Sequence, residues 1–165
     1  MEKHEHLKIA SGTALLFVTV ISIFSFLTKL ITSMIFSEDI YSALSLFLKD
    51  IPFWLIVTAI TIFLLITYLK KYNLNNVQAL ITNETIRLTS GLLITLEGII
   101  NLSNLIPIYY VNIKSYNQTK QLANSAAIEL FRKPLISNGI TIFFILCQVL
   151  TGIYLLKFYK NKIEN

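Results

Sequence analysis

The sequence predicts an all-α integral membrane protein in which four transmembrane helices form one bundle and one domain. Two observations support this fold class. The 165 residues are 55% hydrophobic and only 14% charged, with a mean hydropathy of +0.66, whereas soluble domains are about 45–50% apolar and about 25% charged. The apolar residues are also concentrated in four stretches that are long enough to cross a bilayer. The predicted spans cover residues 9–36, 51–69, 85–111 and 134–157.

The first predicted span follows a short polar N-terminus and carries no charged residue between positions 9 and 28. It lacks the short apolar region and the small-residue cleavage site of a signal peptide, so we expect an uncleaved helix that continues to about residue 36. The first loop, 37–50, contains an apolar run at 40–48 that is too short to span. This run predicts an amphipathic interfacial helix or a re-entrant cap.

Two prolines and a polar stretch help to define the second and third spans. Asp50 followed by Pro52 predicts a helix start, because a carboxylate is a good N-cap and proline suits the first turn. The polar stretch 73–85 predicts a loop, with one or two helical turns lying on the surface. Pro107 falls late in the third span, where the loss of one hydrogen bond predicts a kink near residues 103–104.

The third loop, 112–133, is the longest polar connection. Its segment 119–133 repeats apolar residues at helical spacing, which predicts an amphipathic helix at the interface or docked on the bundle. Pro134 is then expected to open the fourth span. The single cysteine, Cys147, lies inside this span, where it cannot form an internal disulfide and is interpreted as a packing residue.

The positive charges predict the orientation and the partners. Four spans place both termini on one side, and eight Lys and Arg residues fall there against five or six on the other. The positive-inside rule therefore favours cytoplasmic termini in a multi-pass plasma-membrane protein. The net charge of +5 is scattered among helix ends, so membrane lipids rather than nucleic acid are the expected partners. The abundance of lysine, isoleucine and asparagine suggests an AT-rich, bacterial genome.

The third span carries the feature on which the functional hypotheses depend. At helical spacing, five polar residues fall within about one third of its circumference: Arg87, Ser90, Glu97, Asn101 and Asn104. Glu97 lies near the middle of the span, where exposure to lipid would cost a carboxylate several kcal/mol. We therefore expect other helices to cover this stripe.

The expected partners of the stripe lie on the fourth and second helices. They are Gln148, Thr141 and Ser137 on the fourth helix and Thr58 and Thr61 on the second. The predicted intramembrane polar cluster consists of Glu97, Asn101, Asn104, Gln148 and Ser90.

Small residues beside the stripe predict a helix-packing seam, since small side chains let helices approach closely in lipid. The seam consists of Gly91, Thr95 and Gly98. Lys29 and Arg87 are predicted to be interface charges, and Arg87 is therefore not expected among the buried groups. Lys29 is expected to extend to the outer headgroups, with a stretched pairing to Glu97 as the alternative.

The sequence contains no H-E-x-x-H, G-x-S-x-G or glycine-rich phosphate loop, so it predicts no catalytic residues, no metal site and no cofactor. The first functional hypothesis is a small bacterial accessory, immunity or defence protein that assembles with itself or a membrane partner and forms or regulates a pore. The alternative is a small proton- or cation-coupled transporter that uses Glu97, with Asn101 and Gln148 as co-ligands. A purely structural scaffold is the third possibility.

Overall fold

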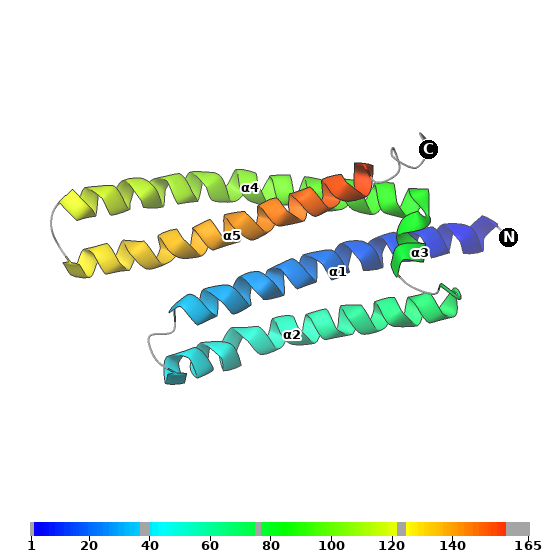
Figure 1. Cartoon of the computed structure of the whole chain (residues 1–165), viewed down its shortest axis with the longest axis horizontal. Helices are drawn as coiled ribbons and strands as arrows, with labels where there is room; N and C mark the ends of the chain where they lie inside the picture. Colours follow the sequence, from blue (N-terminus) through cyan, green and yellow to red (C-terminus); the bar gives the residue numbers. More distant parts are fainter. Residues whose placement is uncertain (1, 37–39, 75–76, 122–124, 158–165) are drawn as a thin grey trace.

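The computed structural model describes residues 2–36, 40–74, 77–121 and 125–157, and these residues form five helices (Figure 1). The helices are α1 (Glu2–Phe36), α2 (Ile40–Lys71), α3 (Val77–Thr82), α4 (Glu84–Gln121) and α5 (Ser125–Lys157). Within the described residues, four helices contain stretches long and apolar enough to cross a membrane: His4–Met34, Pro52–Lys71, Glu84–Gln121 and Phe131–Lys157. The all-helical fold with four candidate spans is therefore confirmed.

The long helices extend beyond the apolar stretches that predicted them. α2 begins at Ile40, so the run 40–48 forms its first turns instead of a separate helix, and the expected helix start at Asp50 is wrong. α5 likewise begins at Ser125, ahead of Pro134, and α4 continues through Pro107 to Gln121. A proline removes a single helical hydrogen bond, whereas breaking the helix would leave several backbone groups unsatisfied. Continuing the helix is therefore the cheaper arrangement.

The four long helices form two antiparallel pairs (Figure 1). α1 packs on α2, and α4 packs on α5 over the most extensive interface in the structure. α1 also contacts both α4 and α5, and so it joins the two pairs, whereas α2 packs mainly on α1. α1 begins and α5 ends at one end of the bundle, which we call the terminal end, and α3 lies there too (Figure 1). We call the opposite end, where α1 ends and α5 begins, the loop end.

The turn that leads into α3 has specific hydrogen bonds. Asn73 has a positive φ of 52°, and its N–H donates to the carbonyl of Lys70 at 3.2 Å while the N–H of Leu74 donates to that of Leu69 at 2.9 Å. This pair of bonds is the Schellman motif, which ends α2. Asn83 then caps α4, since its side-chain oxygen accepts the N–H of Ile86 at 3.1 Å.

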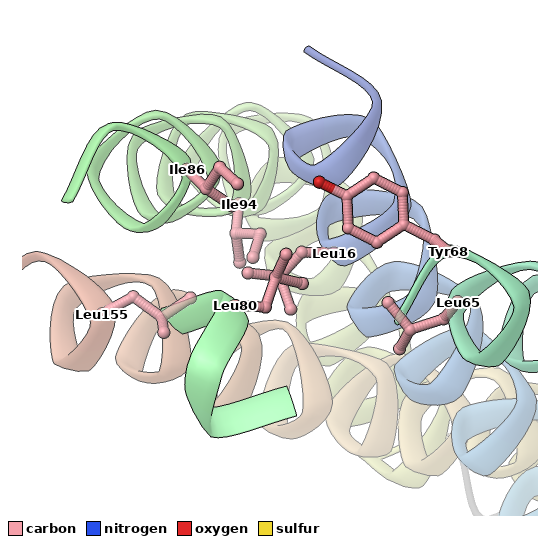
Figure 2. Close-up of a cluster of buried hydrophobic side chains, with 7 residues drawn as sticks. All are labelled: Leu16, Leu65, Tyr68, Leu80, Ile86, Ile94 and Leu155. Carbon is pink, nitrogen blue, oxygen red and sulfur yellow. The ribbon is translucent and has the colours of Figure 1, made fainter. Parts of the chain in front are cut away.

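The buried apolar core lies at the terminal end and is drawn in Figure 2. Its members are Leu16, Leu65, Tyr68, Leu80, Ile86, Ile94 and Leu155. Leu80 comes from the short helix α3 and is only 1% exposed. The expectation that this segment lies on the surface is therefore wrong for Leu80, because the turn after α2 directs α3 across the end of the bundle. The terminal end is closed by this core.

Candidate functional site: a polar cavity between the helix pairs

α4 and α5 approach each other closely at three glycines. A Cβ placed on Gly152 would lie 2.8 Å from the carbonyl oxygen of Gly91 and would collide with Thr95. A Cβ placed on Gly98 would lie 2.5 Å from Cγ2 of Val149. The structure therefore places all three residues of the expected seam against α5. Gly152 was not expected to belong to this seam, although its position four residues after Gln148 places both residues on one face of the helix.

This close approach brings Glu97 against α5. Its carboxylate accepts one hydrogen bond from Nδ2 of Asn101, one helical turn further along α4, and another from Nε2 of Gln148 on α5. Gln148 is only 4% exposed, and its Nε2 also lies 3.4 Å from the carbonyl oxygen of Ile94. Each carboxylate oxygen thus accepts a hydrogen bond from one side-chain amide.

A cavity of about 360 Å³ adjoins Glu97 and lies between α1, α2, α4 and α5. It is on the loop-end side of the Gly91–Gly152 contact. Its charged and amide lining residues are Lys29, Glu97, Asn101, Asn104 and Gln148, and its aromatic lining residues are Phe24, Trp54 and Phe144. Four of the five members of the expected polar cluster therefore line one cavity, with Asn104 exposed at its edge.

The two charged residues of this cavity do not pair with each other. Glu97 is bonded to the two amides, and within the described part of the chain the amine of Lys29 has no hydrogen bond or ion pair. Lys29 is exposed, while Glu97 is partly buried. The cavity therefore contains one carboxylate and one amine, and neither has an oppositely charged partner among the residues that the structure describes.

Ser90 and the two expected partners on α2 lie outside the cavity lining. The hydroxyl of Ser90 is fully buried and lies 3.4 Å from the carbonyl oxygen of Thr13 on α1, outside the cavity lining. The hydroxyls of Thr61 and Ser22 are 3.1 Å apart, and Thr58 donates to the carbonyl oxygen of Ser22 at 3.3 Å. Thr58 and Thr61 thus bond to α1 and not to the stripe on α4, because α2 packs mainly on α1.

Arg87 differs most from its expected position. The expectation that it is not buried is wrong, since its side chain is only 1% exposed. Its Nη1 donates to the carbonyl oxygen of Leu155 at 2.8 Å. Leu155 lies in the last turn of α5, where carbonyls lack intrahelical donors and the helix dipole favours a cation. Arg87 shares a helix face with the buried Ser90 and Ile94, and this spacing was the missed signal.

Comparison of the chain with protein-family models, with curated proteins and with solved structures found no match. The structure alone therefore defines the class, and its four candidate spans suggest a multi-pass membrane protein. Among the described residues, no group of three or more His, Cys, Asp or Glu side chains could hold a metal ion. What the cavity offers chemically is one carboxylate, two amides bonded to it, one amine and several aromatic faces.

Proposed function

We propose that this chain is a small multi-pass plasma-membrane protein that binds a proton or a cationic group at Glu97 and carries it across the bilayer. The observation that supports the proposal is the position of Glu97, which lines a cavity inside an apolar bundle and whose partners among the described residues are amides and no cationic side chain. A carboxylate at such a depth is costly to retain, so intramembrane acids generally mark ion or proton pathways.

The difference between the two ends of the bundle supports a carrier in which the bound ion reaches Glu97 from one side of the membrane at a time. The apolar core and the side chain of Arg87 close the terminal end, whereas the cavity lies toward the loop end. Binding from the loop end therefore requires no rearrangement of the core. Release at the terminal end requires the helix pairs to move relative to each other. Four helices provide few elements for this motion, so we propose that two copies act together.

Flux in proteoliposomes tests the role of Glu97. Proton entry under a potassium diffusion potential is followed with an internal pH-sensitive dye, for the wild-type chain, Glu97→Gln and Glu97→Ala. The matched control is Glu84→Gln, which removes an exposed carboxylate from the first turn of the same helix. We expect flux to be lost in both Glu97 variants and retained in the control. Unchanged flux in Glu97→Gln and Glu97→Ala would exclude Glu97 as the coupling group.

For the orientation, we propose cytoplasmic termini and a loop end that faces outward, with the amphipathic starts of α2 and α5 at the outer interface. The excess of positive residues on the terminal side supports this orientation. Asn73 is exposed and directly follows α2, which ends at the terminal end of the bundle (Figure 1), so Asn73→Cys in a Cys147→Ala background reports the orientation. A membrane-impermeant maleimide should label this cysteine only after the membrane is permeabilised. Labelling of intact cells would show that the termini face outward and would contradict the proposed orientation.

Assembly with a second copy or a membrane partner is the second candidate function. It is favoured by the small share of α2 in the described cavity lining, to which Trp54 is its sole contribution among the described residues. A helix from another chain would supply further lining on this side. Native mass spectrometry of the protein released from mild detergent tests this candidate. A strictly monomeric species with full transport activity would exclude both the assembly function and the proposed pair of carriers.

A further inference from the structure

We propose that the cavity binds a small amphipathic zwitterion, with its ammonium group at Glu97 and its carboxylate at Lys29. This inference rests on the proposed function, since it takes Glu97 as the site of a cationic group. It adds a second recognition residue and a class of solute.

The first argument is the pair of opposite charges in one cavity. Glu97 and Lys29 both line it, and neither has an oppositely charged partner among the described residues. In a medium of low dielectric constant, a lone cation would be attracted by Glu97 but repelled by Lys29, and a lone anion would meet the reverse. A zwitterion supplies both missing partners and adds no net charge to the bilayer interior.

The second argument is the hydrogen-bonding inventory around Glu97. Asn101 and Gln148 both donate amide N–H groups to the carboxylate, and each also carries an amide oxygen, the type of acceptor that an ammonium group with three donors requires. A metal ion requires several oxygen ligands at once. Both oxygens of Glu97 already receive N–H donors, which suits an ammonium group better than a metal.

The third argument is the size and lining of the cavity. About 360 Å³ falls within the range of small-molecule sites and far exceeds the space that a bare ion needs. Phe24, Trp54 and Phe144 line it, and aromatic faces attract ammonium groups and also cover an apolar side chain. The solute that uses all these features has an ammonium group, a carboxylate and an apolar body of amino-acid size.

The test is calorimetric titration of the full chain in lipid nanodiscs, with empty nanodiscs titrated in parallel to subtract partitioning into lipid. The zwitterionic ligands are L-leucine and 6-aminohexanoate, which differ in the separation of their charges. The single-charge ligands are isoamylamine, which is leucine without its carboxylate, and 4-methylpentanoate, which is leucine without its ammonium group. Because each charged hydrogen bond contributes about a tenfold factor or more, at least one zwitterion should bind at least about tenfold more tightly than either single-charge ligand.

Two variants assign the charges. Lys29→Gln alters an exposed residue, so it should fold normally and should abolish the advantage of the zwitterion over isoamylamine. Glu97→Gln should abolish the advantage over 4-methylpentanoate, while Glu97→Asp should retain it and Glu84→Gln should bind as the wild type does. Glu97→Asp keeps the assignment testable if Glu97→Gln fails to fold.

The outcomes separate this inference from the proposed function. If isoamylamine binds as tightly as both zwitterions and Lys29→Gln changes nothing, the zwitterion is overturned while the cationic site at Glu97 stands. If neither zwitterion binds, the inference is overturned as well. If no binding or flux responds to Glu97→Gln, both the inference and the proposed function fail.

Discussion

The contact between α4 and α5 predicts opposite effects for the same substitution at two glycines of α5. At Gly152, an added Cβ would lie 2.8 Å from the carbonyl oxygen of Gly91 and 2.9 Å from the backbone nitrogen of Thr95. Backbone atoms cannot move aside as a flexible side chain can. At Gly139, the nearest atom to an added Cβ is the hydroxyl oxygen of Tyr109 at 3.6 Å, an ordinary contact. Gly139→Ala is therefore a matched control for Gly152→Ala.

The magnitude follows from these contacts. To bring the new methyl group to an ordinary contact of 3.4 Å, α5 must move away from α4 by about 0.6 Å. Overpacking of this kind costs about 1–3 kcal/mol, while alanine gains about 0.5–1 kcal/mol over glycine inside a helix. We therefore expect Gly152→Ala to destabilise the protein by about 1–2 kcal/mol and Gly139→Ala to stabilise it by about 0.5–1 kcal/mol.

The free energy of unfolding is measured by titrating detergent-solubilised protein with sodium dodecyl sulfate and following helix content by circular dichroism. Gly152→Ala should unfold at a lower fraction of dodecyl sulfate than the wild type, and Gly139→Ala at an equal or higher one. Gly91→Ala should resemble Gly152→Ala, since its Cβ would lie 2.9 Å from the carbonyl oxygen of Gly152. Equal stabilities of Gly152→Ala and Gly139→Ala would refute the assigned contact.

Three further predictions use the same unfolding measurement. Arg87→Ala should cost about 2–5 kcal/mol, because it empties a buried site and leaves the Leu155 carbonyl without its donor, whereas Arg132→Ala, on an exposed side chain, should cost less than about 1 kcal/mol. Leu80→Ala should also lower the free energy of unfolding by about 2–5 kcal/mol. Val77→Ala, at a more exposed position of the same short helix, should lower it by less than about 1 kcal/mol. Asn73→Gly should preserve or raise stability, whereas Asn73→Val should cost about 1–2 kcal/mol because a β-branched residue opposes a positive φ. Similar losses within any of these pairs would contradict the burial or backbone geometry assigned to it.

The number and order of the four candidate spanning helices could be predicted from the sequence because an apolar stretch of sufficient length is a strong signal. Helix boundaries were less predictable. Asp50 with Pro52, and also Pro134, resemble helix starts locally, yet α2 and α5 continue through both prolines. Local capping rules describe what each residue tolerates at a terminus. They do not show that a longer helix can absorb the same proline.

The polar cavity was partly predictable, because helical spacing places Glu97, Asn101 and Asn104 on one face of α4. Ser90 has the same spacing but a different environment, since α1 covers the terminal half of that face and the cavity adjoins the other half. The burial of Arg87 was not predicted for a related reason. A hydropathy value reflects the charge of the side chain but not its contact with the end of α5. Helical spacing in the sequence does not show which helix packs on each part of the polar stripe, since that depends on the tertiary structure.

α1 runs from the packed terminal end of the bundle to the cavity on the loop-end side. α1 touches α4 near Thr13 and borders the cavity at Lys29, about 24 Å further along at a rise of about 1.5 Å per residue. A tilt of about 5° with its fulcrum at Thr13 would therefore shift the wall of the cavity by about 2 Å. Gly12 adjoins this fulcrum, and a Cβ there would lie 2.9 Å from Cδ1 of Ile86 and 2.6 Å from the hydroxyl oxygen of Tyr68. The lack of a side chain at Gly12 therefore allows α1 to lie close to Tyr68 of α2 and Ile86 of α4 at the terminal end.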